Sequence, residues 1–136
     1  MKIKIKKLRD NLISPMRSHY NDAGADCFSP QKFTLEPYST TVIPLGFSIE
    51  VPDGYMAVIK PRSSMNAKGI ITQIGTIDSG YRGEVKAVFV NPSNEIFKFY
   101  EHDKICQIVI EPVVLAEYVT EFPSERGDGG FGSTGR

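Results

Sequence analysis

Apolar and polar residues alternate along much of this chain, with the period of two that is typical of β-strands. The first segment, Lys2–Lys6, alternates strictly between lysine and isoleucine. Because successive side chains of a strand point to opposite faces, this pattern predicts a strand with one buried and one solvated face. The segment Thr40–Val51 is rich in β-branched residues and ends at the turn sequence Pro52-Asp53-Gly54, so it is also expected to be extended.

Six further short strands are expected, separated by turn residues about every ten positions. They are Tyr55–Ile59, Ile70–Ile74, Glu84–Val90, Ile96–Tyr100, Ile105–Ile110 and Val113–Val119. Nine prolines and twelve glycines interrupt the chain throughout. The pattern of a helical face is absent except for one turn around Ser63–Ala67. The sequence therefore predicts an all-β fold, arranged as a sandwich, a jelly roll or a barrel.

The last eleven residues, Arg126–Arg136, depart from this pattern because five of them are glycine. A segment of this composition cannot hold one conformation by itself, and a disordered tail is its ordinary interpretation. However, Phe131, an arginine and a Ser-Thr pair lie among the glycines, and they offer a stacking surface, a cation and two hydroxyls. We therefore expect a catalytic body over residues 1–125 and a flexible lid over residues 126–136.

Two glycine motifs in this tail do not indicate the sites that their spacing suggests. Gly130–Gly135 matches G-x-G-x-x-G, but only Arg136 follows, so no helix can present its N-terminus to a pyrophosphate. Gly127–Gly132 has the glycine spacing of a P-loop, but Ser133 stands in the place of the required lysine.

The composition limits the class of partner. A length of 136 residues suits one domain, and 40% hydrophobic with 24% charged residues is typical of a globular protein. Sixteen basic residues balance sixteen acidic ones, so neither nucleic acid nor a membrane surface is an expected partner. The N-terminus does not resemble a signal peptide, and no apolar run approaches the ~18–20 residues of a membrane span. We expect a cytoplasmic protein, and any anionic partner should be small and held by a few local cations and backbone amides.

The cysteines and histidines do not form a metal-binding pattern. Cys27 and Cys106 are far apart, His19 and His102 are isolated, and none has zinc-ligand spacing. We interpret the cysteines as two buried thiols in a reducing cytoplasm, with a bridge between them as the alternative.

Five segments, in order along nearly the whole chain, resemble the deoxyuridine triphosphatase (dUTPase) family. They are Ala23–Asp26; Pro61–Ser64 with Lys68-Gly69; Gly75–Gly83 with Asn91; Asp103–Gln107; and Arg126-Gly127 with Phe131–Gly135. The resemblance implies a jelly-roll-like β-barrel that works as a homotrimer with sites shared between subunits. It also implies magnesium-dependent hydrolysis of dUTP to dUMP and pyrophosphate, which keeps uracil out of DNA and supplies dUMP for thymidylate synthesis.

In the third segment, Asp78 matches the family's water-orienting aspartate. Taken alone, an Asp-Ser-Gly sequence is more often a turn cap, but the resemblance makes Asp78 the expected catalytic residue. By the same resemblance the ring of Tyr81 lies against the deoxyribose and excludes a 2′-hydroxyl.

Backbone groups of the hairpin over residues 72–86 are expected, by the same resemblance, to recognise uracil. The hairpin residues placed near the nucleotide are Gln73, Gly75, Thr76, Ile77 and Lys86. Many family members have an asparagine in this hairpin, and here Gln73 or Thr72 is the candidate substitute.

The second and fourth segments imply contacts to the phosphates. Ser63 and Ser64 are expected to hold the phosphate chain, and Arg62 organises the site around them; a plain helix N-cap is the alternative interpretation. Gln107 lies on the apolar face of an expected strand, where a polar side chain needs a partner, and the family gives it a phosphate oxygen.

By the same resemblance, the first segment implies a metal site and the fifth segment implies a lid that contacts the nucleotide. Asp26 helps to hold waters of a Mg²⁺ ion that is otherwise bound by substrate phosphates, although it could simply cap a turn. In the lid, Phe131 is expected to stack on uracil. The lid residues expected to contact the nucleotide are Arg126, Phe131, Gly132, Ser133 and Thr134.

Three other functions remain as alternatives. A dCTP deaminase has a related fold, but it requires a glutamate at the position of Val88, which cannot relay a proton. A nucleotide-sensing regulator with a protein partner would not need an intact Asp78 and lid, and neither would a structural jelly-roll domain.

Overall fold

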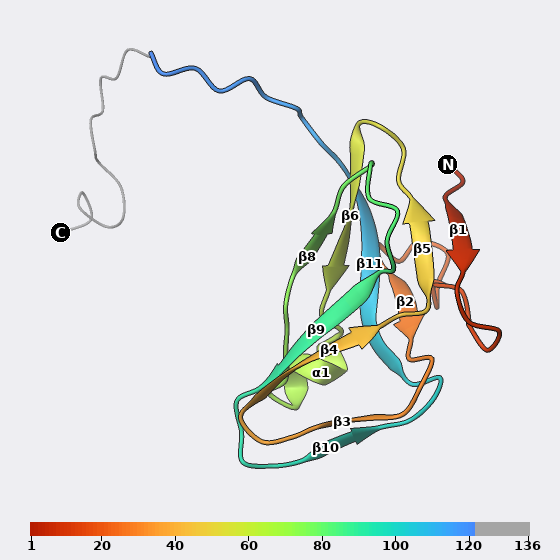
Figure 1. The fold of residues 1–136 in the computed structure, drawn as a ribbon, viewed down its shortest axis with the longest axis vertical. Coiled ribbons are helices and arrows are strands. Elements are labelled where there is room, and N and C mark those ends of the chain that lie inside the picture. The colour runs from red at the N-terminus through yellow and green to blue at the C-terminus, as the bar shows by residue number, and fades with distance from the viewer. Residues whose placement is uncertain (122–136) are drawn as a thin grey trace.

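The computed structural model describes residues 1–121, which form strands almost throughout (Figure 1). The strands are β1 (Lys4–Lys7), β2 (Ala25–Phe28), β3 (Phe33–Leu35), β4 (Ser39–Pro44), β5 (Phe47–Glu50), β6 (Tyr55–Lys60), β7 (Ile71–Thr72), β8 (Gly75–Ile77), β9 (Lys86–Asn91), β10 (Phe97–Phe99) and β11 (Lys104–Pro112). Within these residues the one helix is α1 (Ser63–Ala67), which confirms the single helical turn expected there.

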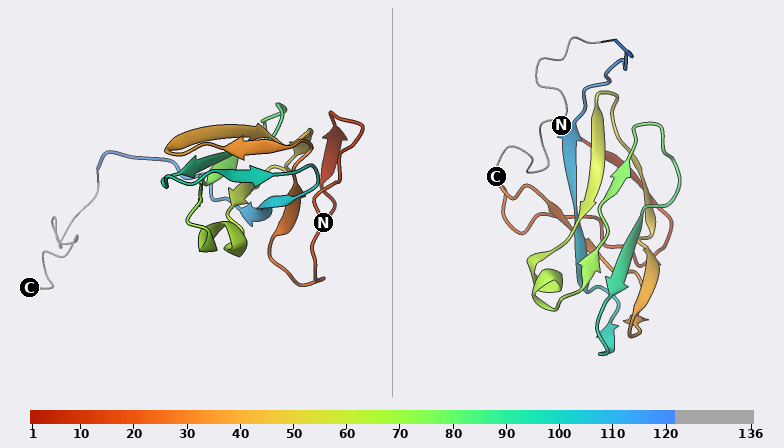
Figure 2. Two further views of the ribbon diagram at one scale, coloured as in Figure 1. Left: turned by 90° about the horizontal axis from the view of Figure 1, so that it is seen from below. Right: turned by 90° about the vertical axis from the view of Figure 1, so that its left-hand side faces the viewer.

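The strands pair into four small antiparallel sheets. The largest has the order β2-β11-β6-β8, and a second has the order β4-β9-β7. Two-stranded sheets, β1-β5 and β10-β3, complete the described part. The pairing of β6 with β11 runs from Gln107 opposite Lys60 to Pro112 opposite Tyr55, and this long ladder forms the spine of the molecule (Figures 1 and 2).

The core lies between these sheets. Phe47, Phe89, Leu35 and Ile59 are almost completely buried. Full burial of one such side chain contributes roughly 1.5–3 kcal/mol to the hydrophobic stabilisation. Strands β6 and β11 are fixed by this packing, so the residues at their ends have defined positions.

The fold class and most of the expected strands are confirmed, but several bounds differ. The segment Thr40–Val51 is extended as expected, but it contains two strands, β4 and β5, which are separated at Leu45-Gly46. Gly46 has a φ of +83°, a left-handed conformation that interrupts a strand. Strands β2, β3 and β8 were missed because they are short and lack an alternating pattern of β-branched residues.

The expected strand Val113–Val119 is also wrong for the single chain. Strand β11 ends at Pro112, and within the described part residues 113–121 belong to no sheet. They run away from the body in Figure 1, leaving Val114, Leu115 and Tyr118 90%, 86% and 93% exposed. Their β-branched and aromatic residues have the composition of a strand, but within one chain they have no strand to pair with.

Candidate active site

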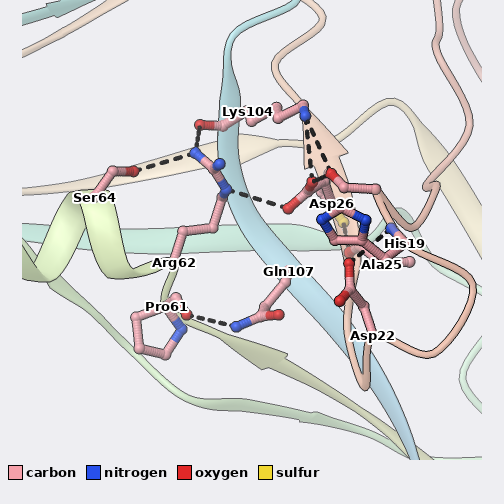
Figure 3. A network of polar contacts seen from close by, with 11 residues as sticks. His19, Asp22, Ala25, Asp26, Pro61, Arg62, Ser64, Lys104 and Gln107 are labelled. Carbon is pink, nitrogen blue, oxygen red and sulfur yellow. Dashed lines mark hydrogen bonds and ion pairs between the residues drawn. The ribbon is translucent and has the colours of Figure 1, made fainter.

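The first group of candidate residues is a polar cluster around Arg62 (Figure 3). Arg62 Nε donates to Asp26 Oδ1 at 3.1 Å, and Lys104 Nζ lies 3.5 Å from Asp26 Oδ2. Arg62 Nη1 also donates to Ser64 Oγ and to the carbonyl of Lys104, both at 3.1 Å. We call Asp26, Arg62, Ser64 and Lys104 the Arg62 cluster. Two cations and a hydroxyl are thereby held in one place by a carboxylate that is only 16% exposed.

The local backbone explains the position of Arg62. It precedes α1 in an extended conformation, with φ −88° and ψ 150°, and makes no side-chain cap. The alternative that this segment is a plain serine N-cap is therefore wrong. The first N–H groups of a helix have no intrahelical acceptor, so Ser63 and Ser64 present donors on the side of the cluster.

Gln107 lies beside this cluster at the centre of the main sheet. It is opposite Asp26 on β2 and opposite Lys60 on β6. Its Nε2 donates to the carbonyl of Pro61 at 2.9 Å, directly before Arg62 (Figure 3). The expectation that this side chain requires a polar partner is confirmed. In the single chain without nucleotide, this partner is the backbone carbonyl of Pro61.

The second group surrounds a cavity of about 220 Å³ between β8 and the start of β9. It is lined by Ile59, Gly75, Thr76, Ile77, Asp78, Tyr81, Glu84, Val85 and Lys86. The expected catalytic aspartate, the three hairpin residues next to it, Tyr81 and Lys86 therefore meet at one cavity. Gln73 does not line the cavity; its backbone N–H donates to the carbonyl of Val88 at 2.8 Å.

The loop that carries Asp78 is fixed by its own polar groups. Tyr81 N–H donates to the Asp78 carbonyl at 3.1 Å, and the Tyr81 hydroxyl donates to the carbonyl of Glu84 at 2.9 Å. Arg82 Nη1 donates to the carbonyls of Ser79 and Tyr81. Glu84 Oε2 accepts from the N–H of Gly46 at 3.0 Å. Sequence reasoning missed Arg82 and Glu84 as site residues, although both lie in or next to the third segment.

Comparison with known proteins identifies the family. A protein-family model described as dUTPase matches residues 10–135 of this chain. The chain belongs to the dUTPase family. A deoxyuridine 5'-triphosphate nucleotidohydrolase of Clostridioides difficile is 42% identical over 139 residues, which cover 98% of this chain and 97% of the relative. A nucleotidohydrolase of the same name from Clostridium acetobutylicum is 44% identical, with coverage of 98% and 96%.

Solved dUTPase structures share the fold. The dUTPase of Staphylococcus bacteriophage 80alpha with dUPNHPP has a TM-score of 0.89 and 30% identity, and the match covers 99% of each chain. A mutant dUTPase from phage phi11 of Staphylococcus aureus, whose structure describes the coordination of a structural Mg(II) ion, has a TM-score of 0.83 and 26% identity. That match covers 89% of this chain and 97% of the phage chain. The expected jelly-roll-like fold is therefore confirmed.

The family residues on this chain form two groups rather than one site. Ile77 lies opposite Ala57 on β6, and Arg62 comes five residues after Ala57. At about 3.3 Å per residue, Asp78 and Arg62 are separated by roughly 16 Å or more along the strand direction.

The lid residues Arg126, Phe131, Gly132, Ser133 and Thr134 lie outside the described residues.

The described residues fit a sparse magnesium site better than a protein cage. Among residues 1–121, no three His, Cys, Asp or Glu side chains lie together as a metal-binding group. The carboxylate of Asp26 accepts from Arg62 Nε at Oδ1 and from Ser18 Oγ at Oδ2, and it also forms an ion pair with Lys104. A carboxylate has about four acceptor positions, so Asp26 retains capacity for a metal-bound water.

The two cysteines of this chain are free and buried, which agrees with the interpretation as thiols. They lie opposite each other on β2 and β11. The neighbouring Cys106 thiol, followed by burial, raises the pKa of the Cys27 thiol well above its ordinary value. In the part of the chain that the structure describes, no helix has the length and apolar character needed to cross a membrane.

Val88, where a dCTP deaminase would need its glutamate, lies on β9 opposite Val42. The neighbouring Asn91 is fully buried, and its Nδ2 donates to the carbonyls of Leu35, Glu36 and Glu95. Asn91 therefore stabilises the end of β9.

Proposed function

We propose that this chain is a dUTP diphosphatase, which hydrolyses dUTP to dUMP and pyrophosphate. The observation that carries the proposal is that Asp78 lines the same cavity as Gly75, Thr76 and Ile77, in a member of the dUTPase family. Uracil enters this cavity, where backbone groups of the hairpin recognise its edge. The ring of Tyr81 lies against the deoxyribose, so a ribonucleotide with its 2′-hydroxyl is excluded.

Asp78 acts as the general base. Its carboxylate accepts a proton from the water that attacks the α-phosphorus, and the bond from this phosphorus to the bridging oxygen breaks. The electron pair goes to that oxygen, and pyrophosphate leaves. A positioned base of this kind contributes ~10²–10⁴-fold to the rate. The hydrogen bonds of Tyr81 and Arg82 to the loop support this role, because they restrict the position of Asp78.

The phosphates bind at the Arg62 cluster. Arg62, Ser63 and Ser64 supply a guanidinium and donors, and charge-assisted hydrogen bonds of this type are short and strong. The amide of Gln107 uses one N–H for Pro61 and retains the other for a phosphate oxygen. Asp26 would hold a water of Mg²⁺, and the bound metal supplies charge neutralisation of the leaving pyrophosphate.

The C-terminal residues complete the site in this proposal. Phe131 stacks on uracil, and Arg126, Ser133 and Thr134 contact the terminal phosphate, with the backbone of Gly132 close to the nucleotide. Base–aromatic stacking contributes ~1–3 kcal/mol in single-strand binders. Deleting residues 126–136 should therefore leave a folded protein with severely reduced turnover.

We further infer a homotrimer in which each site combines residues from different subunits. Two observations support this inference. One dUTP would have to meet both Asp78 and Arg62, which are far apart within one chain. In addition, residues 113–121 expose Val114, Leu115 and Tyr118 almost completely, and exposed apolar side chains of this kind mark contacts with another chain. The free buried thiols support a reducing cytoplasmic compartment.

The activity is tested by the release of pyrophosphate from dUTP, dTTP, dCTP and UTP, each with and without Mg²⁺. We expect rapid release from dUTP alone, and only with the metal. Equal rates for dUTP and UTP would contradict the role of Tyr81. Equal rates for dUTP and dTTP would contradict recognition by a close-fitting hairpin.

The shared site is tested by mixing two inactive variants, Asp78→Asn and Arg62→Ala, under conditions that exchange subunits. Mixed trimers contain some sites in which both residues are intact, so we expect activity to return. Continued inactivity, with subunit exchange verified by mass spectrometry, would show that both residues must belong to the same chain.

A further inference from the structure

Positive charge is concentrated in a groove next to the Arg62 cluster. This groove has a volume of about 460 Å³ and lies between α1 and the connection from β10 to β11. Its lining includes four cationic side chains, Arg62, Lys68, Lys98 and Lys104, and one carboxylate, Asp103. The whole chain has a net charge of zero, so this groove is a local excess of positive charge rather than a general property of the surface.

The four cations are not equally neutralised. Arg62 and Lys104 share the carboxylate of Asp26. Lys68 Nζ lies over the ring of Phe99, 5.2 Å from its centroid. Within residues 1–121, neither Lys68 nor Lys98 has a carboxylate within 4.0 Å. The groove therefore offers two cations that no described acidic side chain pairs with.

The one carboxylate in the lining is already engaged. Asp103 Oδ2 accepts from the N–H of Tyr100 at 2.7 Å, which fixes the turn between β10 and β11. The groove is continuous with Arg62 and Ser64, because both residues line it. An anion that leaves the Arg62 cluster in this direction meets lysines and only one carboxylate.

We propose that this groove binds inorganic pyrophosphate, with one phosphate at Arg62 and Ser64 and the other at Lys68 and Lys98. The proposal rests on the proposed function, in which cleavage produces pyrophosphate beside Arg62. A local excess of cationic side chains attracts an anion, and ammonium groups form strong hydrogen bonds with phosphate oxygens. The groove would hold the product after dUMP has separated, so the two lysines control inhibition by pyrophosphate. A ligand with a single phosphate, such as dUMP, cannot place a phosphate at both positions at once.

Calorimetric titration of the full-length protein with pyrophosphate tests this site, with dUMP titrated separately. The variant is Lys68→Ala/Lys98→Ala, and the matched control is Lys7→Ala, which removes an exposed lysine of β1 outside the groove. We expect the double variant to lose about tenfold or more in pyrophosphate affinity, because two charge-assisted hydrogen bonds are removed. Its affinity for dUMP should stay unchanged, and Lys7→Ala should bind both ligands like the parent.

Two further measurements separate a specific site from general charge attraction. Lys68→Arg/Lys98→Arg keeps the charges and should restore binding, while sulfate should compete only weakly with pyrophosphate. The groove proposal is overturned by unchanged pyrophosphate affinity in a folded double alanine variant, or by sulfate competing as well as pyrophosphate. If the double variant does not fold, Lys98→Ala alone provides the same comparison. A parent protein that binds pyrophosphate through these lysines but does not hydrolyse dUTP would refute the proposed function and leave the groove site intact.

Discussion

The amide group of Gln107 occupies the space that a side chain at position 24 would need. A Cβ atom built on Gly24 would overlap with Oε1 of Gln107. The backbone of Gly24 is not in the left-handed region, so the requirement for glycine is one of space rather than of conformation. We expect Gly24→Ala to displace the Gln107 amide from Pro61 and to destabilise the fold by about 0.5–1.5 kcal/mol, because the hydrogen bond to the Pro61 carbonyl is lost. Thermal unfolding and dUTP turnover measure the two effects.

A double-mutant cycle isolates this contact. In Gly24→Ala/Gln107→Ala the space is free, so the double variant should be more stable than the sum of the single effects predicts. Additive effects would show that Gly24 acts through the backbone and not through Gln107.

Arg62 has three acceptors that a lysine cannot reach together. Its guanidinium contacts Asp26, Ser64 and the carbonyl of Lys104, whereas an ammonium is a single point charge. We expect Arg62→Lys to reduce kcat/KM for dUTP about tenfold or more, with a smaller change in thermal stability. Arg9→Lys, outside the cluster, is the control and should retain full activity. Parent-level activity in Arg62→Lys would mean that the geometry of the cluster is not needed for phosphate binding.

Asp78→Asn tests the general base. The amide has the same shape and cannot accept a proton, so turnover should fall ~10²–10⁴-fold while the affinity for a non-hydrolysable dUTP analogue changes little. Asp53→Asn makes the same substitution in an exposed turn and should leave turnover unchanged. Turnover at the parent rate in Asp78→Asn would remove this carboxylate from the mechanism.

The sequence predicted local features better than long-range contacts. The helical turn Ser63–Ala67 and the strands around β6, β9 and β11 follow from residue patterns within short windows. Strand β2 carries Asp26 but has the sequence Ala-Asp-Cys-Phe, which contains no alternation. Only its pairing with β11, about eighty positions later in the chain, makes it a strand.

The functional site, too, could be predicted from the sequence only as local segments and not as long-range contacts. Each segment of the family pattern could be found from the sequence, but the separation between Asp78 and Arg62 depends on the register of β6 with β8. Lys104 was part of the fourth segment and received no role, because its contact with Asp26 joins two distant strands. Val113–Val119 has the residues of a strand but forms none, because no strand of the described residues pairs with it.

Thr72 carries a buried hydroxyl without a hydrogen-bond partner among the described residues. An unsatisfied polar group costs about 1–3 kcal/mol, and valine has nearly the same shape without this cost. We expect Thr72→Val to raise the free energy of unfolding by about 1 kcal/mol and the unfolding midpoint by about 4 °C. Thr72→Ser, which keeps the hydroxyl, should be less stable than the parent. A less stable Thr72→Val variant would show that the hydroxyl has a partner in the folded protein.

Cys27 provides a prediction about alkaline pH. Its thiol pKa is raised well above the ordinary value in the folded chain, first by the neighbouring Cys106 thiol and then by burial. Below about pH 9, both the folded and the unfolded protein keep this proton, so the contribution to stability is fully present. As the pH rises further, the unfolded chain loses the proton and the folded chain retains it. The free energy of unfolding should then fall by up to ~1.4 kcal/mol per pH unit from this group. Denaturant unfolding at several pH values should show a steeper loss for the parent than for Cys27→Ala. Equal slopes for the two proteins would mean that the Cys27 thiol titrates alike in both states.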